Sequence, residues 1–171
     1  MRAALVAIAL APFLGGCAAA HALTCAELPG RAVPVMHDRH HLAFVDARHV
    51  AYDSIPPTSG PHIAFTVAPG PYADPIPDEL QVHALEHGHV LIQYAPSLPA
   101  SQRREVEHLA RRHLDAVLVA PYPRLRAGIA LTAWGRIDRM GRYDQTRVEA
   151  FVAALSGRYV HGWKHGAHEC R

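Results

Sequence analysis

A short predicted helix that leads directly into an apolar strand constrains the fold of this chain most strongly. Asp78 is a residue type that favours helix starts and Gly88 one that favours helix ends, so the sequence predicts a helix over residues 79–87. Residues 89–94 follow at once and are almost all apolar, which predicts a strand buried on both faces. Because the helix leads directly into a buried strand, side chains in its last turn are expected to point into the packed part of the protein.

The remaining pattern predicts a single domain of the α+β class. A hairpin is expected from strands at 41–45 and 49–52, further strands at 116–120 and 128–134, and further helices at 101–114 and from Asp144 or Thr146 to Leu155. From residue 79 onward the order is helix, strand, helix, strand, strand, helix. This order indicates one α+β domain over residues 41–157, with a central mixed β-sheet covered by helices.

The first residues have the features of an export signal. Arg2 provides a positive start, and the apolar run over residues 3–14 is too short to span a bilayer. The run ends in Leu14-Gly15-Gly16-Cys17, which resembles a bacterial lipobox. The resemblance implies a lipoprotein signal peptide over residues 1–16 and a lipid on the Cys17 sulfur. Ordinary secretory cleavage after residues 18–20 is the alternative and would leave a soluble periplasmic protein.

Under the lipoprotein interpretation, residues 17–40 are a lipid-anchored tether whose partner is the membrane. Ala18 is not the aspartate that retains lipoproteins in an inner membrane, so the cell envelope at the outer membrane is the preferred location if the cell has one. The other two cysteines, Cys25 and Cys170, are expected to pair as a disulfide in an oxidising compartment. Metal binding by one or both of them is the alternative.

The charge pattern argues against nucleic-acid binding. The formal net charge is only +2, and acidic and basic residues are interleaved along the chain, as in Arg103, Arg104, Glu105 and Glu107. A nucleic-acid-binding surface needs positive charge collected on one side.

The spacing of His83 and His87 is the strongest chemical signal in the chain. Positions i and i+4 lie on one helix face, so both imidazoles can reach one metal ion. Glu86 lies about 100° from His87 around the helix, so the two need not serve the same ion. In a hydrolase Glu86 would be the catalytic general base on a metal-bound water, and in a binding protein it would orient a ligand histidine. Histidines that cap carbonyls or bond within a core are the alternative.

Two further histidines are candidates for the same metal site. His62 follows Pro56-Pro57-Thr58-Ser59-Gly60-Pro61, a stiff segment suited to holding one side chain in a fixed place. His41 ends the run Met36-His37-Asp38-Arg39-His40-His41 and opens a predicted strand. A methionine among imidazoles favours copper, whereas imidazoles with a carboxylate suit zinc. Both histidines could equally lie on the surface.

The end of the chain, residues 158–171, is a histidine-rich tail. It contains His161, His165 and His168, of which the first two are four residues apart and could bind metal. An unstructured tail is the alternative.

Four passages together resemble a bacterial family of domains of unknown function, number 3105 (DUF3105). They are Tyr52 with Pro56-Pro57-Thr58-Ser59-Gly60-Pro61-His62, the block Val82-His83-Ala84-Leu85-Glu86-His87-Gly88, Ala120-Pro121-Tyr122-Pro123, and Ala130-Leu131-Thr132-Ala133-Trp134-Gly135-Arg136. The resemblance covers residues 41–155 and implies an exported or membrane-anchored protein. It implies that His62, His83, Glu86 and His87 share a site with Trp134 and Tyr122 near it, and that His41 fits the pattern. The tail departs from the resemblance.

Three functions follow as hypotheses. The first is an exported lipoprotein that binds zinc or copper through His62, His83, His87 and His41. The second is a zinc hydrolase with Glu86 as base, for which Glu149 is the only well-placed further acid. The third is an envelope interaction protein without metal.

Overall fold

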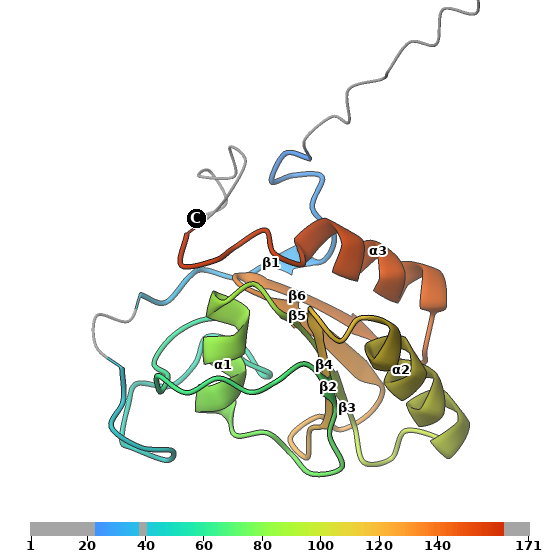
Figure 1. Cartoon of the computed structure of the whole chain (residues 1–171), viewed down its shortest axis with the longest axis horizontal. Coiled ribbons are helices and arrows are strands. Elements are labelled where there is room, and N and C mark those ends of the chain that lie inside the picture. The colour runs from blue at the N-terminus through green and yellow to red at the C-terminus, as the bar shows by residue number, and fades with distance from the viewer. Residues whose placement is uncertain (1–22, 38–40, 163–171) are drawn as a thin grey trace, which may run out of the picture.

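A six-stranded mixed sheet forms the centre of the protein (Figure 1), seen in a computed structural model that describes residues 23–37 and 41–162. The strands are β1 (Arg31–Ala32), β2 (Gly70–Pro71), β3 (Val90–Tyr94), β4 (Val117–Pro121), β5 (Ile129–Ala133) and β6 (Arg136–Met140), in the spatial order β1-β6-β5-β3-β4-β2. β3 and β2 run parallel to β4, and the other neighbours are antiparallel. The predicted α+β class with a central mixed sheet is confirmed.

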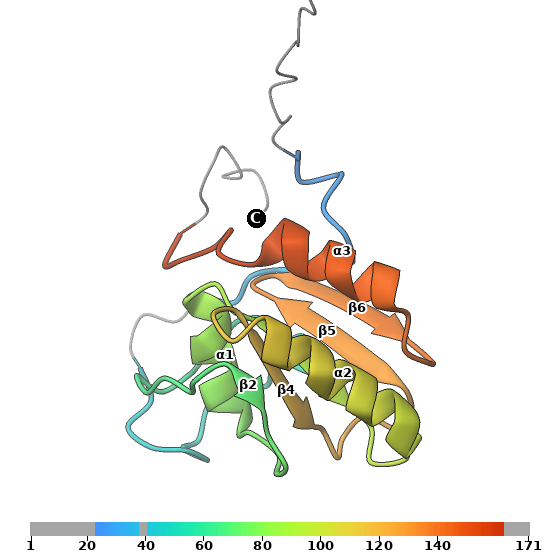
Figure 2. The same cartoon turned by 45° about the vertical axis from the view of Figure 1, so that its right-hand side comes forward.

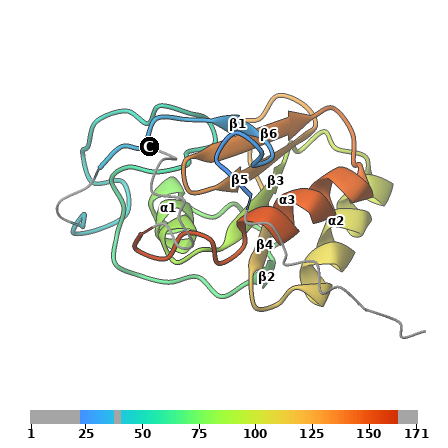
Figure 3. The ribbon, with the colours of Figure 1, turned by 90° about the horizontal axis from the view of Figure 1, so that it is seen from above.

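Three helices cover the two faces of this sheet. The helices are α1 (Asp78–Glu86), α2 (Ala100–Arg112) and α3 (Gln145–Leu155). Side chains alternate along a strand, so Val90 and Ile92 of β3 pack into the core under α2 and α3, whereas Leu91 packs into a second core under α1. Figures 2 and 3 show α2 and α3 together on one side of the sheet and α1 alone on the other.

The end of α1 has the geometry that the sequence predicts. Gly88 has a φ of 88°, and the backbone N–H groups of Gly88 and His89 donate to the carbonyls of Leu85 and Ala84 at 3.0 Å each. These two bonds form the Schellman motif that ends many helices. β3 begins two residues later, at Val90, so the last turn of α1 is fixed directly to the centre of the sheet.

Buried amides tie the middle of α1 to the same sheet. Gln93 of β3 donates from Nε2 to Gln81 Oε1 of α1 at 3.0 Å and to Thr132 Oγ1 of β5 at 2.8 Å, and all three side chains are fully buried. Buried polar groups are almost always hydrogen-bonded, so a shift of α1 that broke these bonds would be unfavourable. The network therefore fixes α1 against β3 and β5.

The predicted hairpin over residues 41–52 is wrong. Leu42 instead forms a parallel bridge with Ile63, and its N–H donates to the His62 carbonyl at 2.7 Å. The alternating pattern was misleading, because Phe44 and Val50 are each 65% exposed and do not form the buried face of a strand. The bridge has a functional consequence, because it brings the segment of His41 beside that of His62.

Three strands lie where the sequence did not predict them: β1, β6 and the two-residue β2, which lies in a proline-rich segment. β6 carries Arg136, Asp138 and Arg139, so its apolar pattern is too broken to indicate a strand. β1 lies in the segment expected to be a tether, and it pairs with β6. Helix ends differ by small amounts, since α1 starts at Asp78 itself, after Pro77. Of the two predicted starts for α3, Asp144 is the one that caps the helix, by accepting from the Arg147 N–H at 3.0 Å. Among the described residues, no helix combines the length and the apolar run that crossing a bilayer requires.

Candidate metal centre

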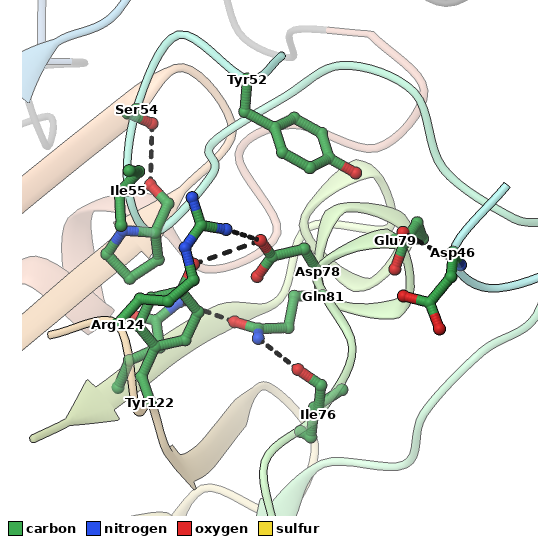
Figure 4. A network of polar contacts seen from close by, with 12 residues as sticks. Asp46, Tyr52, Ser54, Ile55, Ile76, Asp78, Glu79, Gln81, Tyr122 and Arg124 are labelled. Atoms are coloured by element: carbon green, nitrogen blue, oxygen red, sulfur yellow. Dashed lines mark hydrogen bonds and ion pairs between the residues drawn. The ribbon is translucent and has the colours of Figure 1, made fainter. Parts of the chain in front are cut away.

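Polar contacts fix the first turn of α1 (Figure 4). The Asp78 carboxylate accepts from Arg124 Nη1 at 2.7 Å and from the Tyr122 hydroxyl at 3.2 Å, and Gln81 donates to the Ile76 carbonyl at 2.6 Å. Burial raises the pKa of Asp78, and the hydrogen bond from Tyr122 and the charge of Arg124 partly oppose that rise. Asp78 and Arg124 also line an open pocket of about 560 Å³. With its start held in this way and its end held by Gly88, α1 presents its last turn in a fixed position.

Four side chains meet at the last turn of α1. His83 and Glu86 come from the helix, His62 from the proline-rich loop, and His41 from the segment bridged to that loop. One ligand atom from each of the four lies within 4.8 Å of the others. The rings of His41, His62 and His83 lie 4.9 to 5.7 Å apart between centroids. Three members of this group, His41, His62 and His83, belong to the predicted ligand set, and Glu86 is present in place of His87.

The loop that carries His62 is held by its neighbours. Tyr52 donates from its hydroxyl to the Pro61 carbonyl at 2.6 Å, and its ring lies against Gly60. Gly60 has a φ of 116°, a conformation that side-chain-bearing residues rarely adopt. His62 itself is 2% exposed. The loop thus places one imidazole in the interior with little freedom to move.

Hydrogen bonding fixes the tautomer of His62. Its Nδ1 lies 2.8 Å from the Gly60 carbonyl, which can only accept, so Nδ1 carries a proton. Its Nε2 then faces Glu86 Oε2 at 3.1 Å. A lone pair on Nε2 and a carboxylate oxygen repel each other, so a cation, either a second proton on the ring or a metal ion, must lie between them. Ligand atoms about 2.1 Å from a tetrahedral zinc lie roughly 3.4 Å from one another, close to this separation and to the 3.7 Å between His83 Nδ1 and Glu86 Oε2.

His83 is in the protonation state that a metal ligand needs. Burial, followed by the nearby His87 and His62, lowers its pKa to about 4, so the ring is neutral near pH 7. Its Nδ1 is also one of the few buried side-chain atoms, among the described residues, without a hydrogen-bond partner. A buried polar atom without a partner costs about 1–3 kcal/mol. A metal ion at this position would remove that cost.

His87 occupies a different place from the one predicted. Its ring packs against His83 on one side, with 4.6 Å between centroids, and against His161 on the other, with 4.5 Å. It is not among the four residues whose ligand atoms lie mutually close. Burial, and then the neighbouring His161, lower the pKa of His87. The helical spacing of His83 and His87 therefore brings the two rings into contact without bringing both into one ligand set.

His161 is a neighbour of the site that sequence reasoning assigned to a tail. The segment after α3 returns to the end of α1: Gly157 N–H donates to the Gly88 carbonyl at 2.8 Å, and His161 N–H donates to the Glu86 carbonyl at 2.9 Å. A side chain at position 88 would meet the Tyr159 carbonyl at 2.5 Å, so only glycine allows this approach. The Tyr159 ring stacks on the ring of Trp134, with 4.6 Å between the ring centroids.

The remaining predicted residues have separate positions. Trp134 stacks on Tyr159, whose carbonyl lies beside Gly88 at the end of α1 that carries the site. Tyr122 instead contacts Asp78 at the opposite end of α1. Glu149 is on α3, across the sheet from α1, and pairs with Arg112 at 2.9 Å. It therefore cannot complete the metal site of a hydrolase, because the sheet separates it from His83.

Several predicted residues lie outside the described part of the chain. They are Cys17, Cys170, His165, His168 and residues 38–40. Cys25 is disulfide-bonded, but because Cys170 is not described, the pairing of these two cysteines stays a prediction.

The structure thus defines a class: a one-domain α+β protein with a partly buried cluster of histidines and one glutamate at the end of a helix. The chain belongs to the family described as Protein of unknown function (DUF3105), whose family model matches residues 44–167. The match extends past residue 155 into the tail, so the expectation that the tail departs from the family was wrong. No curated protein and no solved structure matches the chain.

The lowered pKa of His83 predicts a pH-dependent stability for the metal-free protein. An unfolded chain protonates this histidine near pH 6.5, whereas the folded protein does so only near 4. The unfolded state therefore binds more protons between these values, and the free energy of unfolding should rise as the pH increases from about 4 to 6.5. Urea denaturation with a chelator present measures this slope. The His83→Gln variant should show a shallower slope, and equal slopes would contradict the assignment.

Proposed function

We propose that this protein binds a transition-metal ion through His41, His62, His83 and Glu86. The observation that carries the proposal is the meeting of one ligand atom from each of these four residues within 4.8 Å of one another, with His62 Nε2 3.1 Å from Glu86 Oε2. The buried Nδ1 of His83, which has no hydrogen-bond partner among the described residues, lies beside the same carboxylate. Three imidazoles and one carboxylate oxygen suit zinc better than copper(I), because copper(I) prefers sulfur.

Each ligand has a support that holds it for this role. The Gly60 carbonyl fixes the tautomer of His62 so that Nε2 is available, as second-sphere partners commonly do at metal sites. The helix end fixes His83 and Glu86, and the bridge between Leu42 and Ile63 places His41. His41 is exposed, so it forms the side of the site at which an ion can enter.

Binding explains the arrangement better than hydrolysis does. A general base needs a carboxylate that is not itself a metal ligand, and Glu86 lies within hydrogen-bonding distance of His62 inside the ligand set. The acid on which the hydrolase hypothesis relied, Glu149, is exposed and paired with Arg112. The proposal therefore places Glu86 in the binding set.

Zinc binding by the purified mature protein tests the proposal. The wild type should bind zinc, and His83→Ala should weaken binding by at least about tenfold, because even partners outside the first coordination sphere are worth about 10–100-fold. Glu86→Gln should also weaken it, since the charge is lost while the shape is kept. Calorimetric titration measures the affinities, and a parallel copper series identifies the preferred metal.

The matched control is His108→Ala, an exposed histidine on α2 away from the site. It should bind zinc as the wild type does. Equal zinc affinity in wild type, His83→Ala and Glu86→Gln would contradict the proposal. Full zinc retention in Glu86→Gln with loss of a hydrolytic activity would favour the hydrolase instead.

The proposal also places the domain outside the cytoplasm, anchored to a membrane by a lipid on Cys17. The support is the Leu14-Gly15-Gly16-Cys17 sequence after a short apolar run, together with the disulfide at Cys25, which suits an oxidising compartment. Cell fractionation of the wild type should place the protein in the membrane fraction, and Cys17→Ser should release it. A wild type that is fully soluble would contradict the anchor.

A further inference from the structure

The segment after α3 returns to the end of α1 that carries two of the proposed ligands (Figure 3). The Gly157 N–H donates to the Gly88 carbonyl at 2.8 Å, and the His161 N–H donates to the carbonyl of Glu86 itself at 2.9 Å. These two bonds join the segment to the turn that ends the helix. They place the side chain of His161 beside that of Glu86.

The imidazole of His161 approaches the Glu86 carboxylate from outside the proposed ligand group. Its Nδ1 lies 3.4 Å from Glu86 Oε2, the oxygen that also faces His62 and His83. His161 is not one of the four residues whose ligand atoms lie mutually close. Its side chain is 54% exposed, whereas that of Glu86 is 18% exposed. The ring of His161 therefore lies on the outer side of the carboxylate.

The same ring also supports the other ligand that α1 provides. The ring of His87 lies between those of His161 and His83, with centroid separations of 4.5 Å and 4.6 Å. A ring that is packed on both sides has little room to turn. His161 therefore contacts Glu86 directly and supports His83 through His87.

The backbone of His161 has a conformation that is uncommon for its residue type. Its φ is 49°, in the left-handed region that few residues other than glycine, asparagine and aspartate adopt. Such a conformation persists only where the surroundings determine it. The bond from the His161 N–H to the Glu86 carbonyl is one contact that does so.

We propose that His161 is a positioning residue for the metal site, which donates from Nδ1–H to the Glu86 carboxylate and does not bind the ion itself. This inference rests on the proposed function. A carboxylate has about four lone-pair positions, so it can accept this hydrogen bond and still bind a metal ion. The 3.4 Å separation is long for a hydrogen bond, and a small turn of the exposed ring closes it when the ion binds. Hydrogen-bond partners of this kind orient ligands at metal sites.

Two substitutions of His161 separate its donor from its backbone conformation. His161→Gly removes the imidazole and accepts the positive φ, whereas His161→Asn accepts the same φ and keeps an N–H donor close to the position of Nδ1. His161→Gly should weaken zinc binding by about 10–100-fold, the usual effect of losing such a partner. His161→Asn should restore most of the lost affinity. Calorimetric titration of the full mature chain measures both, with His108→Ala as the control that leaves the affinity unchanged.

The absorption spectrum of the cobalt(II)-loaded protein adds a measurement that a merely structural role would not change. This spectrum depends on the number and arrangement of the ligands around the ion. It should differ from that of the wild type in His161→Gly and resemble it in His161→Asn. Urea denaturation of the metal-free variants should give the same midpoint as the wild type. If His161→Gly does not fold, His161→Ala takes its place.

Equal zinc affinity in the wild type and His161→Gly would overturn the inference and leave the proposed function intact. Equal weakening in His161→Gly and His161→Asn would also overturn it, because the donor would then not be what matters. A wild type that binds no zinc would instead overturn the proposed function, and the inference with it.

Discussion

The contact between Glu86 and His62 is the interaction on which the rest of this structure depends. A carboxylate oxygen and an imidazole nitrogen meet at 3.1 Å in a partly buried place, and the other ring nitrogen is already committed to a carbonyl. This arrangement is stable only with positive charge between the two atoms. The same carboxylate collects His83 from its own helix and His161 from the segment after α3. Three distant parts of the chain are therefore held together around one negative charge.

The fold can be understood as the support for that charge. The start of α1 is fixed by Asp78 with Arg124 and Tyr122, its middle by the buried amides of Gln81 and Gln93, and its end by the turn at Gly88. β3 follows with almost no connection, so the last turn cannot move independently of the sheet. Such rigidity is what holds ligands at the separations a metal ion requires.

The sequence predicted the parts of the fold and site that depend on local patterns. Gly88 and the apolar run after it predicted α1 and β3. The proline-rich segment before His62 predicted that this side chain is held in a fixed position. The hairpin at 41–52 was wrong because its alternating apolar residues include Phe44 and Val50, which are exposed and form no strand. β6 was missed because its charged residues hide the pattern.

His161 could not be found from its spacing, since it approaches Glu86 only through the fold. The one indirect sign in the sequence was Gly157, a residue type that often follows the end of a helix. In the structure it has a positive φ, and its N–H donates to the Gly88 carbonyl, where the chain turns back toward α1. His87 illustrates the limit of helical spacing. Its i, i+4 relation to His83 is correct as geometry, but the two rings contact each other, and the group of residues that could hold a metal contains Glu86 and not His87.

The most direct test of the central claim is to locate the metal in crystals of the zinc-loaded protein by anomalous diffraction at the zinc edge. The account predicts a peak within about 2.0–2.2 Å of His62 Nε2 and of a Glu86 carboxylate oxygen, the usual zinc–ligand distances. A map with no peak among His41, His62, His83 and Glu86, or with zinc only at residues remote from them, would contradict it.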